Sequence, residues 1–340
     1  MSVQLKPLLS VLFLALASVN AVGQKSGYTV LKSYPIASAG GWDYIALSPT
    51  TNNLYVSHST QVNILNKNTG DSVGVIPGTT GVHGIAFVPG LKKGYTSNGK
   101  LNNVTVFDLN SNTMLKQIET GENPDAIMYD SYTKLIYVCN GRSKDISVID
   151  PNTDEVIKTI ALGGKPETAV SDDAGLIYVN IEDKSEIKVI DTKTYEVAKT
   201  YKTGRGEEPS GLAIDTKTKR LFAGCDNKLL VVLNAENGKV VAELPIGDGC
   251  DGEVFDDDQK LIFSANGEGT LTAIKEVNKD KFEVVENIPT QKSARTLCLD
   301  PETHQIFLPA AEFLPQTAEE KGKRPGMKPG TFKVLVVGKK

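Results

Sequence analysis

The chain has 340 residues, of which 40% are hydrophobic, 41 are acidic and 37 are basic. This hydrophobic content is sufficient for a full core and excludes a wholly disordered chain. The formal net charge of −4 disfavours a strongly basic nucleic-acid-binding protein.

The first 23 residues have the pattern of a secretory signal peptide. Lys6 is their only charged residue, an apolar run extends from Leu8 to Ala17, and small residues that permit cleavage follow. No later segment approaches the roughly 18 consecutive apolar residues that a membrane-spanning helix needs. We therefore predict that residues 1–23 are a signal peptide and that residues 24–340 form a single domain without a membrane span, periplasmic or secreted.

The rest of the chain repeats with a period near 42 residues. Each repeat contains an aromatic residue that follows an apolar residue or glycine, and we call this pair the anchor. The anchors are Leu54-Tyr55, Gly94-Tyr95, Ile136-Tyr137, Ile177-Tyr178, Leu221-Phe222, Ile262-Phe263 and Ile306-Phe307, at intervals of 40, 42, 41, 44, 41 and 44 residues. Periods of this length are typical of repeat architectures such as propellers.

Each repeat is predicted to contain four strands. In the third repeat these are Asp125–Tyr129, the strand around the anchor, Ile146–Asp150 and Val156–Ile160. Short alternating segments separated by Asn, Asp and Gly turns indicate antiparallel hairpins, and no apolar period typical of a helix extends over ten residues. The fold class is therefore predicted to be all-β: a seven-bladed β-propeller with four antiparallel strands per blade.

The last repeat lacks its outer strand, because only three residues follow Phe332–Val337. Near the start of the chain, Tyr28–Ile36 has the pattern of an outer strand such as Val156–Ile160. We expect this N-terminal strand to close the last blade, which would remove an exposed sheet edge.

Polar residues recur where each inner strand begins. The aligned column is Asp43, His83, Asp125, Glu167, Ser210, Asp251 and Arg295. In a propeller these positions gather at one mouth of the central channel, on the face that we call the top. We predict a ligand-binding rim made of Asp43, His58, His83, Asp125, Glu167, Asp251 and Arg295. Its carboxylates can supply the oxygen ligands of a divalent cation, and the alternative is a hydrated rim without a ligand.

Two histidines suggest a more specific metal site. His58 ends the second strand of the first blade and His83 begins the next blade, so adjacent blades are expected to bring them together. With Asp43 or Glu312 they would form a site for zinc or another transition metal. The spacing matches no recognised ligand motif, so two solvated histidines are the alternative.

One segment, at about residues 312–330, interrupts the period of the last blade. Its place between the second and third strands predicts a loop on the top face, and loops of this length are often functional. Four cations of the segment are predicted to form a lid over the acidic mouth: Lys321, Lys323, Arg324 and Lys328.

The repeats resemble the YVTN-repeat, YncE-like family of secreted seven-bladed propellers, within the WD40/YVTN repeat-like superfamily. The supporting segments are Leu54–Ser57, Ile136–Asn140, Gly163–Glu167, Glu208–Ala213 and Asn266–Thr270. The resemblance covers nearly all of the chain after the signal peptide. It implies the fold and the compartment, but it implies little about function, because one fold hosts many functions.

The four cysteines divide into two groups. Cys139 and Cys298 lie inside strand patterns and are expected to act as small core residues. Cys225 and Cys250 are a candidate disulfide, which an oxidising compartment would permit. Members of the family that these repeats resemble often carry a cysteine at the position of Gly206. This chain has no cysteine there, so Cys250 takes its place as the candidate partner of Cys225. The alternative is that both thiols are free.

The favoured function is an exported, monomeric binding module for a small molecule or a protein. No nucleophile elbow, phosphate loop or haem-attachment motif is present, so no catalytic residue is assigned. The alternative is a metal-dependent lactonase-like hydrolase, with the metal held by Asp43, Glu167, Asp251 and the two histidines. A weaker third class is nucleic-acid binding, through a local basic patch such as Lys217, Lys219 and Arg220.

Overall fold

The structure, a computed structural model, describes residues 26–38, 40–316 and 325–340. The strands of the first four blades are β2 (Trp42–Leu47), β3 (Asn53–His58), β4 (Gln61–Asn66), β5 (Ser72–Pro77), β6 (Val82–Val88), β7 (Lys93–Asn98), β8 (Asn103–Asp108), β9 (Met114–Glu119), β10 (Pro124–Asp130), β11 (Leu135–Asn140), β12 (Asp145–Asp150), β13 (Glu155–Ala161), β14 (Pro166–Ser171), β15 (Leu176–Ile181), β16 (Glu186–Asp191) and β17 (Glu196–Lys202). Those of the last three are β18 (Pro209–Asp215), β19 (Arg220–Cys225), β20 (Leu229–Asn234), β21 (Val240–Pro245), β22 (Cys250–Asp256), β23 (Leu261–Asn266), β24 (Thr270–Asn278), β25 (Lys281–Pro289), β26 (Cys298–Asp300), β27 (Gln305–Ala310), β28 (Lys333–Lys339) and β1 (Tyr28–Pro35). Two single-turn 3-10 helices, η1 (Pro89–Leu91) and η2 (Glu182–Lys184), lie between strands.

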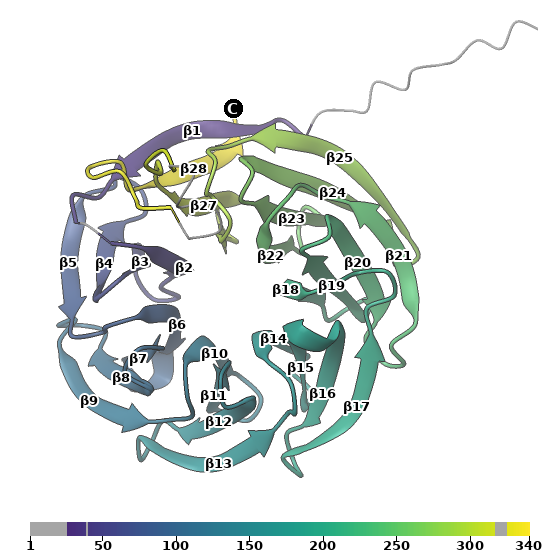
Figure 1. Ribbon diagram of the computed structural model, residues 1–340, viewed down its shortest axis with the longest axis horizontal. Helices are drawn as coiled ribbons and strands as arrows, with labels where there is room; N and C mark the ends of the chain where they lie inside the picture. Colours follow the sequence, from purple (N-terminus) through teal and green to yellow (C-terminus); the bar gives the residue numbers. More distant parts are fainter. Residues whose placement is uncertain (1–25, 39, 317–324) are drawn as a thin grey trace, which may run out of the picture.

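The strands form seven sheets of four strands each. Figure 1 shows the sheets as blades of a ring, with β2, β6, β10, β14, β18 and β22 nearest the central channel and β5, β9, β13, β17, β21 and β25 on the outside. Strands that follow one another in a blade pair antiparallel, as in β10, β11, β12 and β13. The predicted seven-bladed β-propeller is confirmed.

The anchors lie in the second strand of every blade, and their aromatic side chains are buried. The hydrophobic cores lie between neighbouring blades: one joins Tyr137 and Val148 of blade three to Ile177 of blade four. Some anchor tyrosines also bond to the next blade. The hydroxyl of Tyr55 donates to Asn112 Oδ1 at 2.8 Å, in the turn between β8 and β9. The repeated aromatic residue therefore holds each blade against the next.

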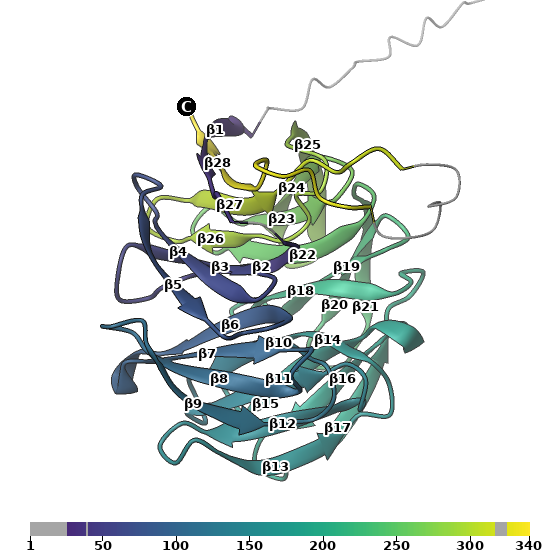
Figure 2. The same ribbon diagram turned by 60° about the vertical axis from the view of Figure 1, so that its left-hand side comes forward.

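The N-terminal strand closes the ring, as predicted. β1 pairs antiparallel with β28, from Tyr28 opposite Lys339 to Pro35 opposite Lys333, and so becomes the outer strand of blade seven. Figure 2 shows these two strands side by side at the edge of the ring, beyond β27 and β26. Blade seven thus combines strands from both ends of the described chain.

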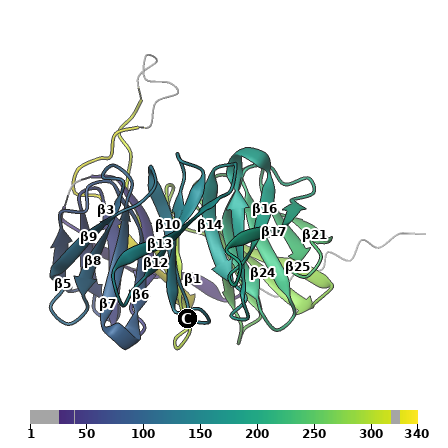
Figure 3. The same cartoon turned by 90° about the horizontal axis from the view of Figure 1, so that it is seen from below.

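The segment that interrupts the repeat lies between β27 and β28, and its described ends project from one face of the ring in Figure 3, opposite the face where the C-terminus lies. At its base, Phe313 and Met327 form an isolated antiparallel bridge. The predicted signal peptide, residues 1–23, lies outside the described residues. Within the described part of the chain, no helix is long and apolar enough to cross a membrane.

Candidate functional site

Six inner strands break their pairing at the position that the repeat alignment singles out. In β2 the pairing with β3 passes from Trp42 directly to Ile45, which leaves Asp43 in a bulge. Similar breaks occur near the starts of β6, β10, β14, β18 and β22. A bulge bends its strand and re-aims a side chain. Together with Arg295, which precedes β26, the residues at these breaks form what we call the mouth cluster: Asp43, His83, Asp125, Glu167, Ser210, Asp251 and Arg295.

Small residues next to the cluster allow the inner strands to approach one another closely. A Cβ atom on Gly84 would lie 2.8 Å from Ile127 Cγ2 and 3.0 Å from the Asp125 carbonyl oxygen, both in the next blade. A Cβ on Gly252 would lie 3.2 Å from the Cα of Thr296. These contacts bring cluster residues of neighbouring blades within bonding distance of one another.

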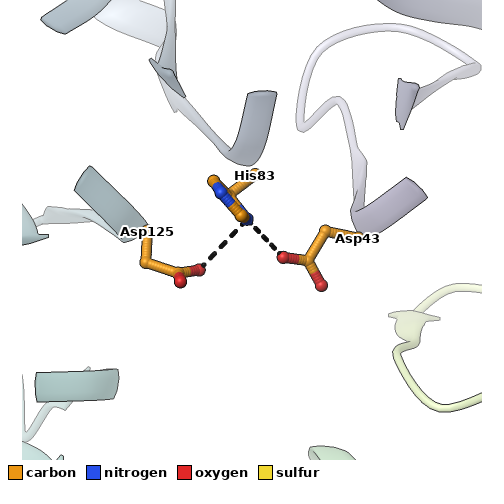
Figure 4. A group of neighbouring side chains, drawn as sticks. All are labelled: Asp43, His83 and Asp125. Atoms are coloured by element: carbon orange, nitrogen blue, oxygen red, sulfur yellow. Dashed lines mark hydrogen bonds and ion pairs between the residues drawn. The ribbon is translucent and has the colours of Figure 1, made fainter. Parts of the chain in front are cut away.

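His83 lies between carboxylates of the two flanking blades, as Figure 4 shows. Its Nδ1 is 2.6 Å from Asp43 Oδ2 and 3.6 Å from Asp125 Oδ1. Because a carboxylate only accepts, Nδ1 carries the proton and donates it to Asp43. Burial lowers the pKa of His83, but the hydrogen bond to Asp43 and the charge of Asp125 outweigh burial and raise the pKa above its ordinary value. The nitrogen and two carboxylate oxygens lie within 4.8 Å of one another, close enough to hold a metal ion in place of that proton.

Arg295 joins the first blade to the sixth across the mouth. Its Nη2 donates to Asp43 Oδ1 at 3.1 Å, and its Nε donates to Asp251 Oδ2 at 2.5 Å. The other Asp251 oxygen, Oδ1, accepts from the hydroxyl of Ser210 at 2.5 Å. Asp43 and Asp251 are thus compensated by a guanidinium that does not lose its charge.

Asp125 and Glu167 are less well compensated. Each is 8% exposed, and they occupy equivalent positions in the adjacent blades three and four. Burial raises the pKa of Asp125 to about 7, against the opposing charge of His83 and with the help of Asp43 and Asp251. Burial and the neighbouring Asp125 raise the pKa of Glu167 well above its ordinary value, although Lys165 Nζ lies 3.3 Å from Glu167 Oε2. Lys165 also pairs with Glu182, so it is shared between two carboxylates.

Two cavities adjoin the mouth cluster. One, of about 370 Å³, is lined by Glu167, Ser210, Asp251 and Arg295 together with residues of the top-face loops. The other, of about 150 Å³, is lined mainly by residues that follow the cluster along the inner strands: Tyr44, Ile45, Gly84, Ile85, Ala126, Ile127, Met128, Thr168 and Ala169, with Tyr137. The mouth therefore has a polar hollow and a mostly apolar hollow.

Tyr44 is a site residue that reasoning from the sequence missed. It lies in blade one and lines the smaller cavity together with residues of blades two, three and four. Burial, and then the charges of Glu167 and Asp125, raise the pKa of its hydroxyl well above the ordinary value. The aligned repeats could have identified Tyr44, because it is the one large residue at its position. The other blades carry small residues there: Gly84, Ala126, Thr168, Gly211, Gly252 and Thr296.

His58, predicted at the rim and as a metal ligand beside His83, does not lie there. It is fully buried, its Nε2 is 2.9 Å from the Gly40 carbonyl oxygen, and its Nδ1 is 2.6 Å from Ser38 Oγ. Its ring packs on Phe332 at a centroid distance of 4.0 Å. Since Gly40 O only accepts, Nε2 carries a proton, and burial lowers the pKa of His58. His58 is a neutral core residue between blades one and seven.

The proposed disulfide is absent, because Cys225 and Cys250 are both free and buried thiols. Cys250 Sγ lies 3.2 Å from Glu253 Oε1 and donates to it. Cys225 faces a different neighbour: a Cβ on Gly206 would lie 2.5 Å from its Sγ. Two cysteines that lie at neighbouring strand ends thus point to separate partners.

The predicted lid falls largely outside the described residues, which include neither Lys321, Lys323 nor Arg324. Lys328 is described and pairs within the segment itself, with its Nζ 2.8 Å from Glu312 Oε2. Glu312 is not among the side chains that are grouped closely enough to hold a metal ion in the described part of the chain, which are Asp43, His83 and Asp125. The base of the segment is fixed by Phe313, whose ring stacks on Trp42 at 5.9 Å.

The basic patch considered for nucleic acid is largely neutralised. Lys217 pairs with Asp257, and the guanidinium of Arg220 is buried, where it bonds to the Lys279 carbonyl and to Asp280. Only Lys219 of the three has no ion pair among those that the described residues form.

Arg295→Ala should destabilise the protein by about 3 kcal/mol at neutral pH, because Asp43 and Asp251 would lose the cation between them while remaining partly buried. Urea unfolding followed by circular dichroism measures the change. Arg205→Ala is the matched control, since Arg205 is 77% exposed in its pair with Glu243 and should contribute less than about 1 kcal/mol. Equal small losses in both variants would contradict the bridging role of Arg295.

Comparison with known proteins supports the fold and nothing finer. No family model matches the chain, and no curated protein matches it either. Among solved structures, Kuenenia stuttgartiensis hydrazine synthase is similar with a TM-score of 0.72 and 17% sequence identity, over 80% of this chain and 94% of that chain. At this identity the likeness concerns the β-propeller alone.

Proposed function

We propose that this chain is an exported β-propeller binding protein of the YVTN-repeat, YncE-like type, which binds a small cationic ligand at the mouth of its channel. The apolar N-terminal run of the sequence supports export, and the repeated anchors support the family. The mouth cluster supports the binding role. It gathers four carboxylates, Asp43, Asp125, Glu167 and Asp251, at equivalent positions of four blades.

One observation carries the proposal: two buried carboxylate oxygens at the mouth lack a hydrogen-bond donor. Among the described residues, none donates a hydrogen bond of good geometry to Asp125 Oδ1 or to Glu167 Oε2, which lie 3.6 Å from His83 Nδ1 and 3.3 Å from Lys165 Nζ. Their nearest cations, His83 and Lys165, are each shared with a further carboxylate. Burial with this incomplete compensation disfavours the charged form of both carboxyl groups and raises their pKa values, so a ligand cation that supplies both charge and donors would be stabilised here.

Thermal unfolding with a panel of small ions tests this function. We expect at least one of n-butylammonium, tetramethylammonium, Ca²⁺ and Zn²⁺ to raise the melting temperature, whereas n-butyrate does not. A cation at 100 times its Kd adds about 2.7 kcal/mol of stability. The Asp125→Asn, Glu167→Gln double variant should lose the shift. Asp226→Asn, which removes an exposed carboxylate that lines the 370 Å³ cavity but is not part of the mouth cluster, should retain the shift.

The panel has a clear negative outcome. If no cation raises the melting temperature, or if the double variant responds as the wild type does, the mouth is a solvated structural rim. Asp226→Asn controls for a general effect of negative charge on the top face, because it changes the charge as much as either single substitution.

A second function, a metal-dependent lactonase-like hydrolase, is favoured by the grouping of Asp43, His83 and Asp125. One nitrogen and two carboxylate ligands suit a zinc ion with an open position, where a bound water becomes a better nucleophile. In the same panel, Zn²⁺ would then stabilise the protein at one ion per chain, and His83→Ala would abolish that effect. Stabilisation by organic cations alone would favour the binding module.

A further inference from the structure

Three buried acceptor atoms without a hydrogen-bond donor lie at the starts of two adjacent inner strands. They are Asp125 Oδ1 in β10, and Glu167 Oε2 and Thr168 Oγ1 in β14. No described residue donates a hydrogen bond of good geometry to any of them, although Lys165 Nζ lies 3.3 Å from Glu167 Oε2 and His83 Nδ1 lies 3.6 Å from Asp125 Oδ1. Asp43 and Asp251 differ in this respect, because Arg295 donates to both. Among the residues of the mouth cluster and those that directly follow them, the acceptors without a donor therefore lie in blades three and four.

The number and type of these atoms point to one kind of donor. Two are carboxylate oxygens and one is a hydroxyl oxygen, and each can accept a hydrogen bond. A primary ammonium group carries one positive charge and three N–H donors, as a lysine side chain does. A quaternary ammonium has the charge without the donors, and a neutral alcohol has a donor without the charge.

The adjoining cavity defines the rest of the ligand. It has a volume of about 150 Å³, and its wall includes Thr168, the apolar side chains of Ile127, Met128 and Ala169, and Tyr44. Of the three acceptors, Thr168 lines this cavity itself, whereas Asp125 and Glu167 directly precede its lining residues Ala126 and Thr168. At about 30 Å³ for each water-sized group, it accommodates about five such groups.

We infer that the mouth binds a primary alkylamine, with its ammonium group at Asp125, Glu167 and Thr168 and its short apolar chain against Tyr44 and Met128. This inference rests on the proposed function, since it names the chemical class of the cation. Donation to the three acceptors satisfies the buried polar atoms, and the chain removes apolar surface of the cavity from water.

Isothermal titration calorimetry of the wild-type protein tests the inference with probes that separate charge, donors and apolar chain. We expect n-butylammonium to bind at least about tenfold more tightly than tetramethylammonium, which corresponds to about 1.4 kcal/mol. n-Butanol should give no measurable binding. Nα-acetyl-lysine amide carries the same ammonium group on a peptide-like backbone. If it binds more tightly than n-butylammonium, the natural ligand of the ammonium site is a lysine side chain of a protein rather than a free amine.

Thr168→Val is the most specific variant, because it removes the hydroxyl and keeps the branched shape. It should weaken n-butylammonium about three- to tenfold and leave tetramethylammonium unchanged. Asp125→Asn and Glu167→Gln should each weaken both cations, and Asp226→Asn should weaken neither. Circular dichroism and the melting temperature establish that each variant is folded.

The outcomes separate this inference from the proposed function. If tetramethylammonium, Ca²⁺ or Zn²⁺ binds as tightly as n-butylammonium and depends on Asp125 and Glu167, the primary-amine inference is overturned while cation binding stands. An equal effect of Thr168→Val on both organic cations would likewise overturn the primary-amine inference alone. If no cation binds to the wild-type protein, both proposals fall.

Discussion

Deletion of residues 26–36 should abolish the cooperative unfolding transition of the protein, because this segment supplies the outer strand of blade seven. β1 pairs with β28 along its length, and its side chains also contact both neighbouring blades. The ring of Tyr28 packs on Phe263 of blade six at 4.9 Å. The hydroxyl of Tyr34 donates to the Lys67 carbonyl of blade one at 2.8 Å.

The expected loss is comparable to the whole stability of a typical protein. Tyr28, Tyr34 and Ile36 are buried, and each large apolar side chain contributes about 1.5–3 kcal/mol by burial. Deletion would also expose the edge of β28, whose residues Val334–Val337 are buried. Since total stability is about 5–15 kcal/mol, a ring opened at this point should retain little of it.

Thermal unfolding followed by circular dichroism measures this effect. Ser33→Ala, at an exposed position of the same strand, is the control and should change stability by less than about 0.5 kcal/mol. A synthetic peptide of residues 26–37 should restore part of the transition when added to the truncated protein. A truncated protein that melts as the full-length protein does would show that β1 does not close the ring.

Glu253→Gln should make the protein more stable than the wild type at pH 8 but nearly equal to it at pH 5. Glu253 is 7% exposed, and its carboxyl group accepts from Ser264 Oγ at 2.9 Å and from Cys250 Sγ at 3.2 Å. Burial raises the pKa of Glu253 from 4.5 to about 8. Glutamine keeps the shape of the side chain and has no proton to lose.

The sign follows from proton binding. Between about pH 4.5 and pH 8 the folded protein keeps a proton on Glu253 that the unfolded chain has lost. Stability must therefore fall as the pH rises through this window, by about 1.4 kcal/mol per pH unit. Over the three units from pH 5 to pH 8 the difference between variant and wild type should reach about 4 kcal/mol.

Urea unfolding at several pH values measures the difference, and Glu186→Gln serves as the control of opposite sign. Burial raises the pKa of Glu186, but Lys202 and Lys188 outweigh burial and lower the pKa below its ordinary value. Its glutamine variant should therefore be less stable at neutral pH, with a loss that fades in acid. Parallel curves for Glu253→Gln and the wild type would show that Glu253 is ionised when folded.

The fold was predictable because its determinants recur within the sequence. Each blade repeats an anchor such as Ile136-Tyr137, and a side chain buried in one blade implies its equivalent in the next. The same reasoning placed Asp43, His83, Asp125 and Arg295 together, since equivalent positions around a ring face one channel. The role of β1 was predictable because the strands counted along the sequence left the last blade without an outer strand.

Reasoning from the sequence failed where a side chain's direction depends on local register. His58 pairs with Trp42, one residue before the bulge at Asp43, and its ring lies against Phe332 rather than beside His83. Cys225 and Cys250 lie at neighbouring strand ends but contact Gly206 and Glu253 respectively. In both cases the prediction placed the two residues at the ends of neighbouring strands, which is correct, but the predicted contact between their side chains was wrong.

The sequence by itself determined the number of blades, the strand that closes the ring and the ring position of the mouth residues, because hydrophobic and turn patterns repeat along the chain. Only the tertiary structure decided which cluster residues compensate one another. Arg295 reaches Asp43 and Asp251, whereas Asp125, Glu167 and Thr168 are left with buried acceptors. Such pairing depends on distances of a few ångströms between blades, which bulges and small residues such as Gly84 set and which no repeat period encodes.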